Sequence, residues 1–521
     1  MAVAIKRFLI LLLLTGALAQ HAYSQIQTAK VTGGVVQGVV TEDISIFKGI
    51  PFAAPPVGDL RWRAPAPVQP WTGIKKTVAF GPACMQPENS QGNTAPVSED
   101  CLYLNVWTPA KNANAKIPVL VWIHGGGFSG GSTSIPMYDG TGFAKKGLVV
   151  VSLAYRVGPF GFLAHPELSR ESGHGSGDYG LADMIAGLRW VKKNINRFGG
   201  DPARVTIFGH SAGGMAVNML AASPVARGLF KRVICMSGGS FAPLQTSNRA
   251  VTGLGIPTLQ LAESNGEAFL KKLGVADIKA ARALTAEAIQ KGVGGGPDAM
   301  RFRPVADGYI IPTDLYTIYQ ARRFQGTPIL VGNTSNELGA FMGGRNMTAA
   351  KFEQRIKSQY GRYADTILNV YPHATDAESA RSAIELSRDS MFGWSTWTWA
   401  RLQSGKARGK AFEYYFDYHA PDADGSGHGS DVPFAFQTLA TRRGEPGPED
   451  KRLSEMISSY WANFARTGNP NGQGLPRWPA FTVNDQKVMV FDTAPGARTT
   501  PNLDKLKAYD AYISWLRKEA K

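Results

Sequence analysis

Beyond its N-terminus, the sequence of 521 residues lacks any apolar run long enough to cross a membrane. A helix that spans a bilayer needs about 20 consecutive apolar residues. The chain also shows no internal repeat with a period of about 20 to 50 residues, which excludes solenoids and propellers. Its 44% of hydrophobic and 18% of charged residues are typical of a globular protein rather than a disordered or fibrous chain.

Long runs of like charge are also missing. The chain carries 56 basic and 40 acidic residues, for a formal net charge of +16, but the lysines and arginines are dispersed. Neither a zinc-finger spacing nor an aromatic RNA-binding signature accompanies them. We therefore expect a basic surface without a nucleic-acid partner, and we expect neither a metal nor a cofactor.

Cysteine is scarce, with three residues in the whole chain. In an exported protein, Cys84 and Cys101 are able to close a short surface loop by a disulfide. Cys235 lies in the apolar run Val233–Met236, which predicts a buried structural thiol. A catalytic role of Cys235 has little support, because no motif for cysteine catalysis surrounds it.

The N-terminus has the order of a secretory signal peptide. Lys6 and Arg7 precede the apolar run Phe8–Leu14, and small residues follow. We predict a signal peptide over residues 1–24 and a secreted or periplasmic mature protein without a membrane span. The alternative is an uncleaved membrane anchor, for which the apolar run is short.

Short apolar segments predict buried strands, and a spacing of three and four residues between apolar positions predicts helices. The predicted strands are Ile117–Ile123, Leu148–Tyr155, Arg204–Phe208, Lys231–Met236 and Pro328–Val331. The predicted helices are Gly180–Phe198 and Gly213–Ala222. Because strands alternate with helices, the sequence predicts an α/β protein whose large, mostly parallel central sheet is flanked by helices.

A single catalytic domain over residues 25–521 accounts for these elements. Prolines and glycines are frequent in the first hundred residues, which predicts an antiparallel or irregular edge of the sheet rather than a separate domain. The stretch from about residue 246 to 391 is mainly helical by pattern. We expect it to form insertions that cover the active site.

Ser211 lies in a pattern that is typical of a nucleophile elbow. The predicted strand Arg204–Phe208 leads into Gly209–Gly213, which has the form Gly-x-Ser-x-Gly, and a predicted helix follows. The two glycines allow strand and helix to approach closely while the serine occupies an exposed tip. The five residues alone are a weak signal, but their position between a strand and a helix predicts that Ser211 is a catalytic nucleophile.

A second motif, His124–Phe128, follows the predicted strand Ile117–Ile123 and contains three consecutive glycines. Successive glycines allow backbone N–H groups to converge on one point. A tetrahedral oxyanion needs such donors in place before it forms. We predict that Gly126 and Gly127 supply two N–H groups and that Ala212, the residue after the serine, supplies a third.

A nucleophilic serine needs a base, and the base needs an acid that orients it. In the chain order of α/β-hydrolases both follow the serine. The histidines after Ser211 are His373, His419 and His428. Composition favours His428, because it lies in the small-residue loop Gly425–Asp431. The acid stays open at this level, and the candidates are Glu337, Asp307 and Asp389.

Six further segments carry long, specific patterns. They are Phe47–Ala53, Leu60–Trp62, Ser98–Val106, Tyr155–Phe162, Phe198–Pro202 and Trp461–Pro470. In these segments and in the two glycine motifs, the chain resembles the type-B carboxylesterase family, which includes the cholinesterases. The similarity extends from about Val31 to Arg517, and a chance match does not explain so many segments in order.

The resemblance implies an α/β-hydrolase fold with a complete catalytic triad and no cofactor. It assigns the acid to Glu337 and the base to His428, because both lie in segments that match those of the family. It also implies a disulfide between Cys84 and Cys101, and it places Ser237 behind the triad.

The chain departs from the family in two places. His210 precedes the nucleophile where many members carry a glutamate. It is either a structural residue or one that alters the charge around the triad and with it the pH optimum. Residues 85–100, between the two cysteines, include no aromatic residue, whereas cholinesterases carry one there that binds quaternary ammonium. We therefore do not expect a choline-ester specialist.

The substrate pocket is the least defined part of this interpretation. Phe128 and Phe341 adjoin the predicted catalytic motifs and are its candidates. Trp394, Trp397 and Trp399 share one helical segment, in which an aromatic stripe is more often core than pocket.

Together, these patterns predict a secreted, monomeric serine carboxylesterase that hydrolyses small-molecule esters through an acyl-enzyme on Ser211. Alkyl or aryl esters of modest size are the default substrates. The first alternative is a non-catalytic adhesion or binding protein of the same fold, against which the complete triad argues. The second is a lipase, feruloyl esterase or detoxifying esterase of narrow specificity.

Overall fold

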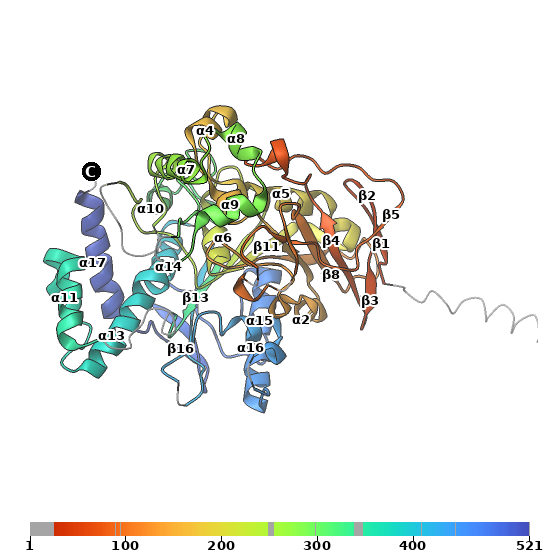
Figure 1. Ribbon diagram of the computed structural model, residues 1–521. Helices are drawn as coiled ribbons and strands as arrows, with labels where there is room; N and C mark the ends of the chain where they lie inside the picture. The colour runs from red at the N-terminus through yellow and green to blue at the C-terminus, as the bar shows by residue number, and fades with distance from the viewer. Residues whose placement is uncertain are drawn as a thin grey trace, which may run out of the picture.

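The computed structural model describes residues 25–519, apart from the segments 248–254, 297–298 and 338–346 and positions 89, 94, 408, 422 and 443. The predicted signal peptide lies outside the described residues. A large twisted sheet crosses the molecule, and helices cover both of its faces (Figure 1). The core is therefore built as three layers, helix on sheet on helix.

The large sheet contains eleven strands within the described residues. They are β3 (Val39–Thr41), β4 (Ile44–Pro51), β8 (Tyr103–Thr108), β9 (Ile117–Ile123), β10 (Val149–Leu153), β11 (Gly200–His210), β12 (Arg232–Met236), β13 (Ile329–Thr334), β14 (Ala411–Phe416), β15 (Lys487–Phe491) and β16 (Gly496–Thr499). Their order is β16-β15-β14-β13-β12-β11-β9-β10-β8-β4-β3. All pairs from β15 to β10 are parallel, whereas β16 and the strands from β8 to β3 pair antiparallel.

Two smaller sheets belong to the N-terminal region. One contains β1 (Thr28–Val31), β2 (Gly34–Gln37) and β5 (Ile74–Lys76), and the other contains β6 (Ala83–Cys84) and β7 (Val97–Ser98). Together with the antiparallel strands β3, β4 and β8, they confirm the antiparallel or irregular edge that the prolines and glycines predicted.

Helices connect the strands and cover the sheet. They are α2 (Thr141–Lys145), α3 (Gly158–Phe162), α4 (Pro166–Ser172), α5 (Tyr179–Asn194), α6 (Ala212–Ala222), α7 (Leu259–Leu273), α8 (Ile278–Arg282), α9 (Ala286–Val293), α10 (Leu315–Gln320), α11 (Ala349–Tyr360), α12 (Ala364–Leu368), α13 (Asp376–Arg388), α14 (Trp394–Lys406), α15 (Val432–Phe436), α16 (Pro448–Thr467) and α17 (Leu503–Glu519). Shorter 3-10 turns are η1 (Gly58–Leu60), η2 (Ser90–Gly92), η3 (Pro136–Tyr138), η4 (Ile195–Phe198), η6 (Gly361–Tyr363) and η8 (Leu439–Thr441), and η7 (Asp389–Gly393) is a π-helical turn. Among the described helices, none has both the length and the apolar character of a membrane span.

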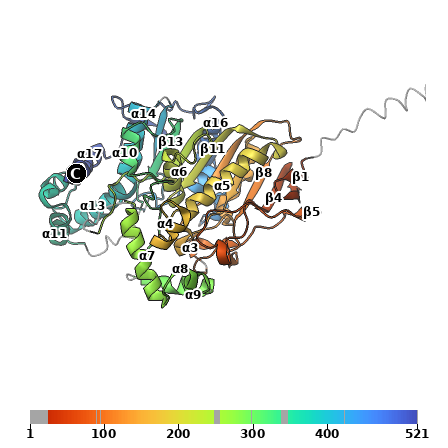
Figure 2. The ribbon, with the colours of Figure 1, turned by 90° about the horizontal axis from the view of Figure 1, so that it is seen from above.

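The predicted α/β architecture is confirmed, and its elements differ from the prediction mainly at their ends. The strand predicted over Ile117–Ile123 coincides with β9, and β11 extends the strand predicted over Arg204–Phe208 in both directions. The single helix predicted over Gly180–Phe198 is α5 followed by the 3-10 turn η4. Helices α5 and α6 cover one face of the sheet and α16 the other (Figure 2).

Five of the helices between residues 246 and 391 form two groups. Helices α7, α8 and α9 lie together, whereas α11 and α13 lie beside the C-terminal helix α17 at the far end of the molecule (Figures 1 and 2). Residues of the first group and of η7 line the cavity described below, and none of α11 or α13 does so. The division of residues 25–521 into one catalytic domain with insertions remains a prediction.

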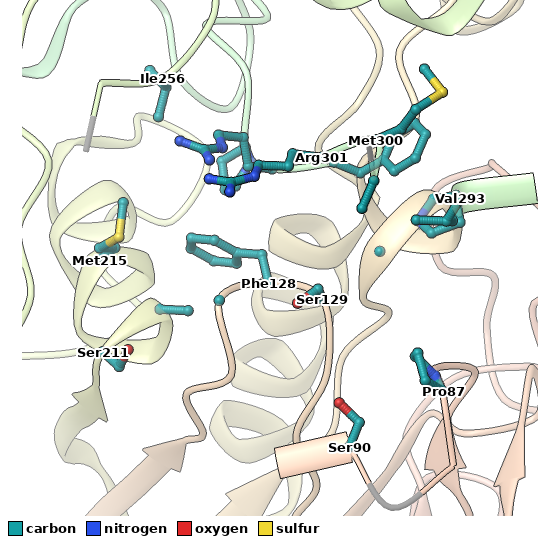
Figure 3. A pocket seen from close by; sticks show the side chains of 18 of the residues that line it. Pro87, Ser90, Phe128, Ser129, Ser211, Met215, Ile256, Val293, Met300 and Arg301 are labelled. Atoms are coloured by element: carbon teal, nitrogen blue, oxygen red, sulfur yellow. The ribbon is translucent and has the colours of Figure 1, made fainter. Parts of the chain in front are cut away.

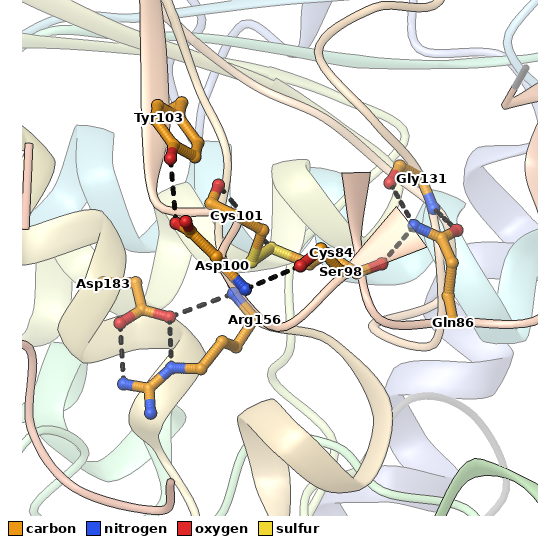
Figure 4. Close-up of a disulfide and its surroundings, with 9 residues drawn as sticks. All are labelled: Cys84, Gln86, Ser98, Asp100, Cys101, Tyr103, Gly131, Arg156 and Asp183. Carbon is orange, nitrogen blue, oxygen red and sulfur yellow. Dashed lines mark hydrogen bonds and ion pairs between the residues drawn. A yellow bond between two sulfur atoms is a disulfide. The ribbon is translucent and has the colours of Figure 1, made fainter. Parts of the chain in front are cut away.

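The three cysteines have the states that were expected. Cys84 and Cys101 form a disulfide (Figure 4). Cys235 is a buried free thiol on β12. Beside the disulfide, the Gln86 amide donates to Cys84 O at 2.9 Å and to Gly131 O at 2.8 Å, and it accepts from the Gly131 N–H. The disulfide loop is thereby attached to the glycine-rich segment that follows β9.

Replacing Cys84 and Cys101 together by serine should lower the free energy of unfolding by about 3 kcal/mol, because the disulfide restricts the unfolded chain. Urea denaturation of the oxidised wild type and of the double variant measures this difference. The reduced wild type is the matched control and should unfold with the variant. Equal midpoints and slopes for all three samples would contradict a stabilising role of this disulfide.

Candidate active site

Ser211 occupies the turn between β11 and α6. Its backbone has a positive φ of 57° with ψ −123°, a conformation that residues other than glycine rarely adopt, and its N–H donates to Met236 O at 2.9 Å. A Cβ on Gly209 would lie 2.3 Å from Gly213 O, and a Cβ on Gly213 would lie 2.1 Å from Ile123 O. Side chains are therefore excluded at both glycines, and the serine is held at the tip of a strained, closely packed turn.

The glycine-rich segment follows β9 and lies against this turn. A Cβ on Gly125 would lie 3.1 Å from that of Ser211. Gly126 and Gly127 have φ values of 118° and 63°, and a Cβ on Gly126 would lie 2.2 Å from Gly130 O. Among the described residues, no backbone group accepts from the N–H of Gly126 or of Gly127. Both donors are thus available to another acceptor.

Glu337 and His428 lie together although they are far apart in the chain. His428 Nδ1 donates to Glu337 Oε2. The other carboxylate oxygen, Oε1, accepts from Ser237 Oγ at 2.6 Å and from the Thr334 N–H at 2.8 Å. Glu337 is only 1% exposed. Because both oxygens have donors, the buried carboxylate is held in one orientation and fixes the imidazole of His428.

The electrostatic environment of His428 favours its protonated form. Burial by itself lowers the pKa of His428, but the carboxylate of Glu337 raises it, and the net pKa lies above the ordinary value. The ring of Phe392 stacks on this imidazole with 4.9 Å between the centroids. A histidine in this setting is suited to accept a proton and to hold the resulting charge.

The other candidate acids and bases have different surroundings. Asp389 forms an ion pair with Arg388 at 2.7 Å, and Asp307 accepts three backbone N–H groups of the turn that follows it. Neither of these partners is a histidine, whereas Glu337 accepts from His428, which lines the cavity that contains Ser211. His373 and His419 do not line it. Of the residues that the sequence left open, the structure brings Glu337 and His428 into contact, and His428 faces this cavity.

A cavity of about 490 Å³ opens over Ser211 (Figure 3). Ser211, His428, Gly127 and Ala212 all line it, whereas Gly126 is not among its lining residues. The predicted nucleophile, the predicted base and two of the three predicted oxyanion donors therefore face the same space.

The cavity walls differ in part from the predicted pocket. Phe128 lines the cavity, as expected, and Phe341 lies outside the described residues. Trp394, Trp397 and Trp399 are buried in the core instead. Lining residues for which the local sequence carries no signal are Met215, Ile256, Arg301, Arg303, Met391 and Phe392. They come from helix interiors and connecting segments without a motif.

Comparison with known proteins covers most of the chain. The sequence profile of the carboxylesterase family matches residues 21–508. Fumonisin B1 esterase of Sphingopyxis macrogoltabida is 37% identical over 486 residues, which cover 89% of this chain and 86% of that protein. Para-nitrobenzyl esterase of Bacillus subtilis (strain 168) is 34% identical over 502 residues, which cover 91% and 96%.

The chain belongs to the carboxylesterase family.

Solved structures agree with this assignment. A PNB esterase, 32% identical, superimposes with a TM-score of 0.79 over 93% of this chain and 100% of its own. Carboxylesterase EST55 of Geobacillus stearothermophilus, also 32% identical, has a TM-score of 0.81 over 93% and 100%. The predicted α/β-hydrolase fold is confirmed, and the protein is a carboxylic ester hydrolase, as the resemblance implied.

His210, where the chain departs from many members of this family, lies against the base. The centroids of the His210 and His428 rings are 4.5 Å apart. Burial, and next the charge of His428, lower the pKa of His210 well below its ordinary value, so His210 is neutral at neutral pH. A Cβ on Gly429 would lie 2.9 Å from His210 Cε1. The imidazole of His210 therefore packs closely against the loop that carries His428, and it adds no charge beside His428.

Replacing His210 by glutamate should move the acid limb of the pH–rate profile to higher pH. A carboxylate beside His428 stabilises the imidazolium and raises the pKa of His428, so the neutral base is lost at a higher pH as the solution is acidified. Measurement of kcat/KM for p-nitrophenyl butyrate from about pH 5 to 9 reports the position of this limb.

His210→Gln is the matched control, because it removes the imidazole without adding a charge. Its acid limb should coincide with that of the wild type. If the limb of His210→Glu also coincides with that of the wild type, His210 has a structural role only.

Proposed function

We propose that the protein is a serine carboxylesterase in which Ser211 is the nucleophile, His428 the general base and Glu337 the acid that orients the base. One observation carries this proposal. Glu337 accepts hydrogen bonds from Ser237 and from His428, and His428 lines the same cavity as Ser211. A nucleophile, an oriented imidazole and a space for the substrate are thus next to one another.

In the first half of the reaction, Ser211 Oγ attacks the carbonyl carbon of the ester, and His428 Nε2 takes the hydroxyl proton. Nδ1 keeps its own proton in the bond to Glu337, which stabilises the imidazolium. The C–O bond to the alcohol then breaks, and His428 returns the proton to the leaving alkoxide. The acyl group remains on Ser211 as an ester.

The oxyanion of both tetrahedral intermediates is assigned to the N–H groups of Gly126, Gly127 and Ala212. Loss of one such donor typically raises the barrier by about 2.7–4 kcal/mol.

In the second half of the reaction, water attacks the acyl-enzyme while His428 accepts its proton. The carboxylic acid leaves and Ser211 recovers its hydrogen, so that one ester and one water give one acid and one alcohol.

We further propose that the enzyme is exported after removal of residues 1–24 and acts as a monomer. The order of charged, apolar and small residues at the N-terminus supports export. The Cys84–Cys101 disulfide agrees with it, because disulfides persist mainly in oxidising compartments. As substrates we propose alkyl or aryl esters of modest size, in line with the cavity volume of about 490 Å³.

Ser211→Ala should reduce kcat for p-nitrophenyl butyrate by a factor of about 10⁴ or more, because no other group supplies the nucleophile. The variant should also resist labelling by a fluorophosphonate probe, while its circular-dichroism melting curve stays that of the wild type. These results would also separate the enzyme from a non-catalytic adhesion protein of the same fold, which the probe does not label.

Ser90→Ala is the matched control, because Ser90 lines the same cavity. It should still be labelled by the probe. Labelling of Ser211→Ala at the rate of the wild type, or turnover at a comparable rate, would show that the nucleophile is a different residue.

A further inference from the structure

Two arginines line the cavity that contains Ser211. Arg301 and Arg303 follow α9 in the chain, and the buried Phe302 stands between them. Arg301 is exposed and Arg303 is half-buried. In the view of Figure 3, Arg301 lies beyond the Phe128 ring as seen from Ser211. Both arginines thus belong to the lining of the cavity, and Arg301 lies away from Ser211.

Within the described part of the chain, neither arginine has an ion pair or a hydrogen bond through its guanidinium. The buried arginines elsewhere in this protein differ. Arg61 pairs with Glu99 at 2.6 Å, Arg156 with Asp183 at 2.7 Å and Arg388 with Asp389 at 2.7 Å. Arg303 is partly withdrawn from water without such a partner, which is unfavourable unless a ligand supplies one.

The charge balance of the cavity is one-sided. Its described lining includes no aspartate or glutamate, and His428 is the titratable residue there besides the two arginines. Burial, and next the charge of Arg301, lower the pKa of Arg303. The charge of Arg301 thus disfavours the charge of Arg303 on the same cavity lining, and a negative group bound there would offset this repulsion.

We propose that the substrates of this enzyme carry a carboxylate in addition to the ester, and that Arg301 and Arg303 bind this carboxylate while Ser211 attacks the ester carbonyl. Guanidinium groups match the geometry of a carboxylate and bind it with two parallel hydrogen bonds. Apolar residues such as Phe128 and Met215 line the cavity as well, and they suit an uncharged spacer between the two groups. The inference rests on the proposed function of Ser211 and specifies its substrate class.

Two pairs of probe esters, each a carboxylate and its carboxamide isostere, test this inference on the full mature chain. Mono-p-nitrophenyl adipate and p-nitrophenyl 5-carbamoylpentanoate carry the difference on the acyl side. The 4-butyryloxy derivatives of benzoate and of benzamide carry it on the alcohol side. We expect kcat/KM of the carboxylate to exceed that of the amide about tenfold or more in at least one pair, and the ratio to fall as salt is added.

The pair that shows the preference identifies which side of the ester faces the arginines. Arg301→Gln and Arg303→Gln should each bring the carboxylate-to-amide ratio of kcat/KM for that pair close to one. Arg303→Lys should give a ratio between those of Arg303→Gln and the wild type, because lysine keeps the positive charge but cannot form the two parallel hydrogen bonds of a guanidinium group. Arg301 is exposed, so its variant carries the test if Arg303→Gln does not fold. Arg189→Gln, at an exposed arginine of α5 that does not line the cavity, is the matched control and should keep the wild-type ratio.

A wild-type ratio of one or less in both pairs would overturn the inference, and so would a preference that survives in both glutamine variants. In these two cases the amides would still be hydrolysed, and the serine mechanism would stand. If the wild type hydrolyses none of the four esters, nor p-nitrophenyl butyrate, the proposed function itself fails.

Discussion

The buried carboxylate of Glu337 is the group on which the rest of the site depends. A charge that is 1% exposed is costly unless donors replace the water that it loses. Here His428, Ser237 and the Thr334 N–H replace that water, and each comes from a different part of the chain. The same contacts that stabilise the charge also orient the imidazole. Stability of the fold and geometry of the site are therefore coupled through one side chain.

The central parallel strands explain why these groups meet. In the ladders of the sheet, His210 at the end of β11 is paired with Met236 at the end of β12, and Met236 with Gly332 of β13. The residues that follow the three strands thus leave the sheet on the same side, at the carboxyl ends of the strands, where ligands bind in open α/β sheets. Ser211 and Ser237 come directly after the first two strands. Catalytic geometry follows here from strand order and register.

The substrate side of the cavity is built in a different way. Its walls come from the connection after α9, from α6 and from the π-helical turn η7. None of these segments is a strand of the sheet. The catalytic end is constrained by the backbone, so Gly126 and Gly213 tolerate no side chain. The arginines and methionines of the wall are not constrained in that way. Side chains of the wall can therefore differ without changing the backbone of the turn at Ser211.

The sequence by itself determined the parts of the protein that follow from local backbone geometry. The turn at Ser211 and the glycine turn after β9 were predictable because each needs particular residues at adjacent positions. The acid was not, since Glu337, Asp307 and Asp389 were equal on pattern, and only the resemblance to a family separated them. The tertiary structure decided which carboxylate contacts His428 and which side chains line the cavity. Both depend on contacts between residues that are distant in the chain, such as Glu337 and His428 at a sequence separation of 91, and local sequence carries no record of such contacts.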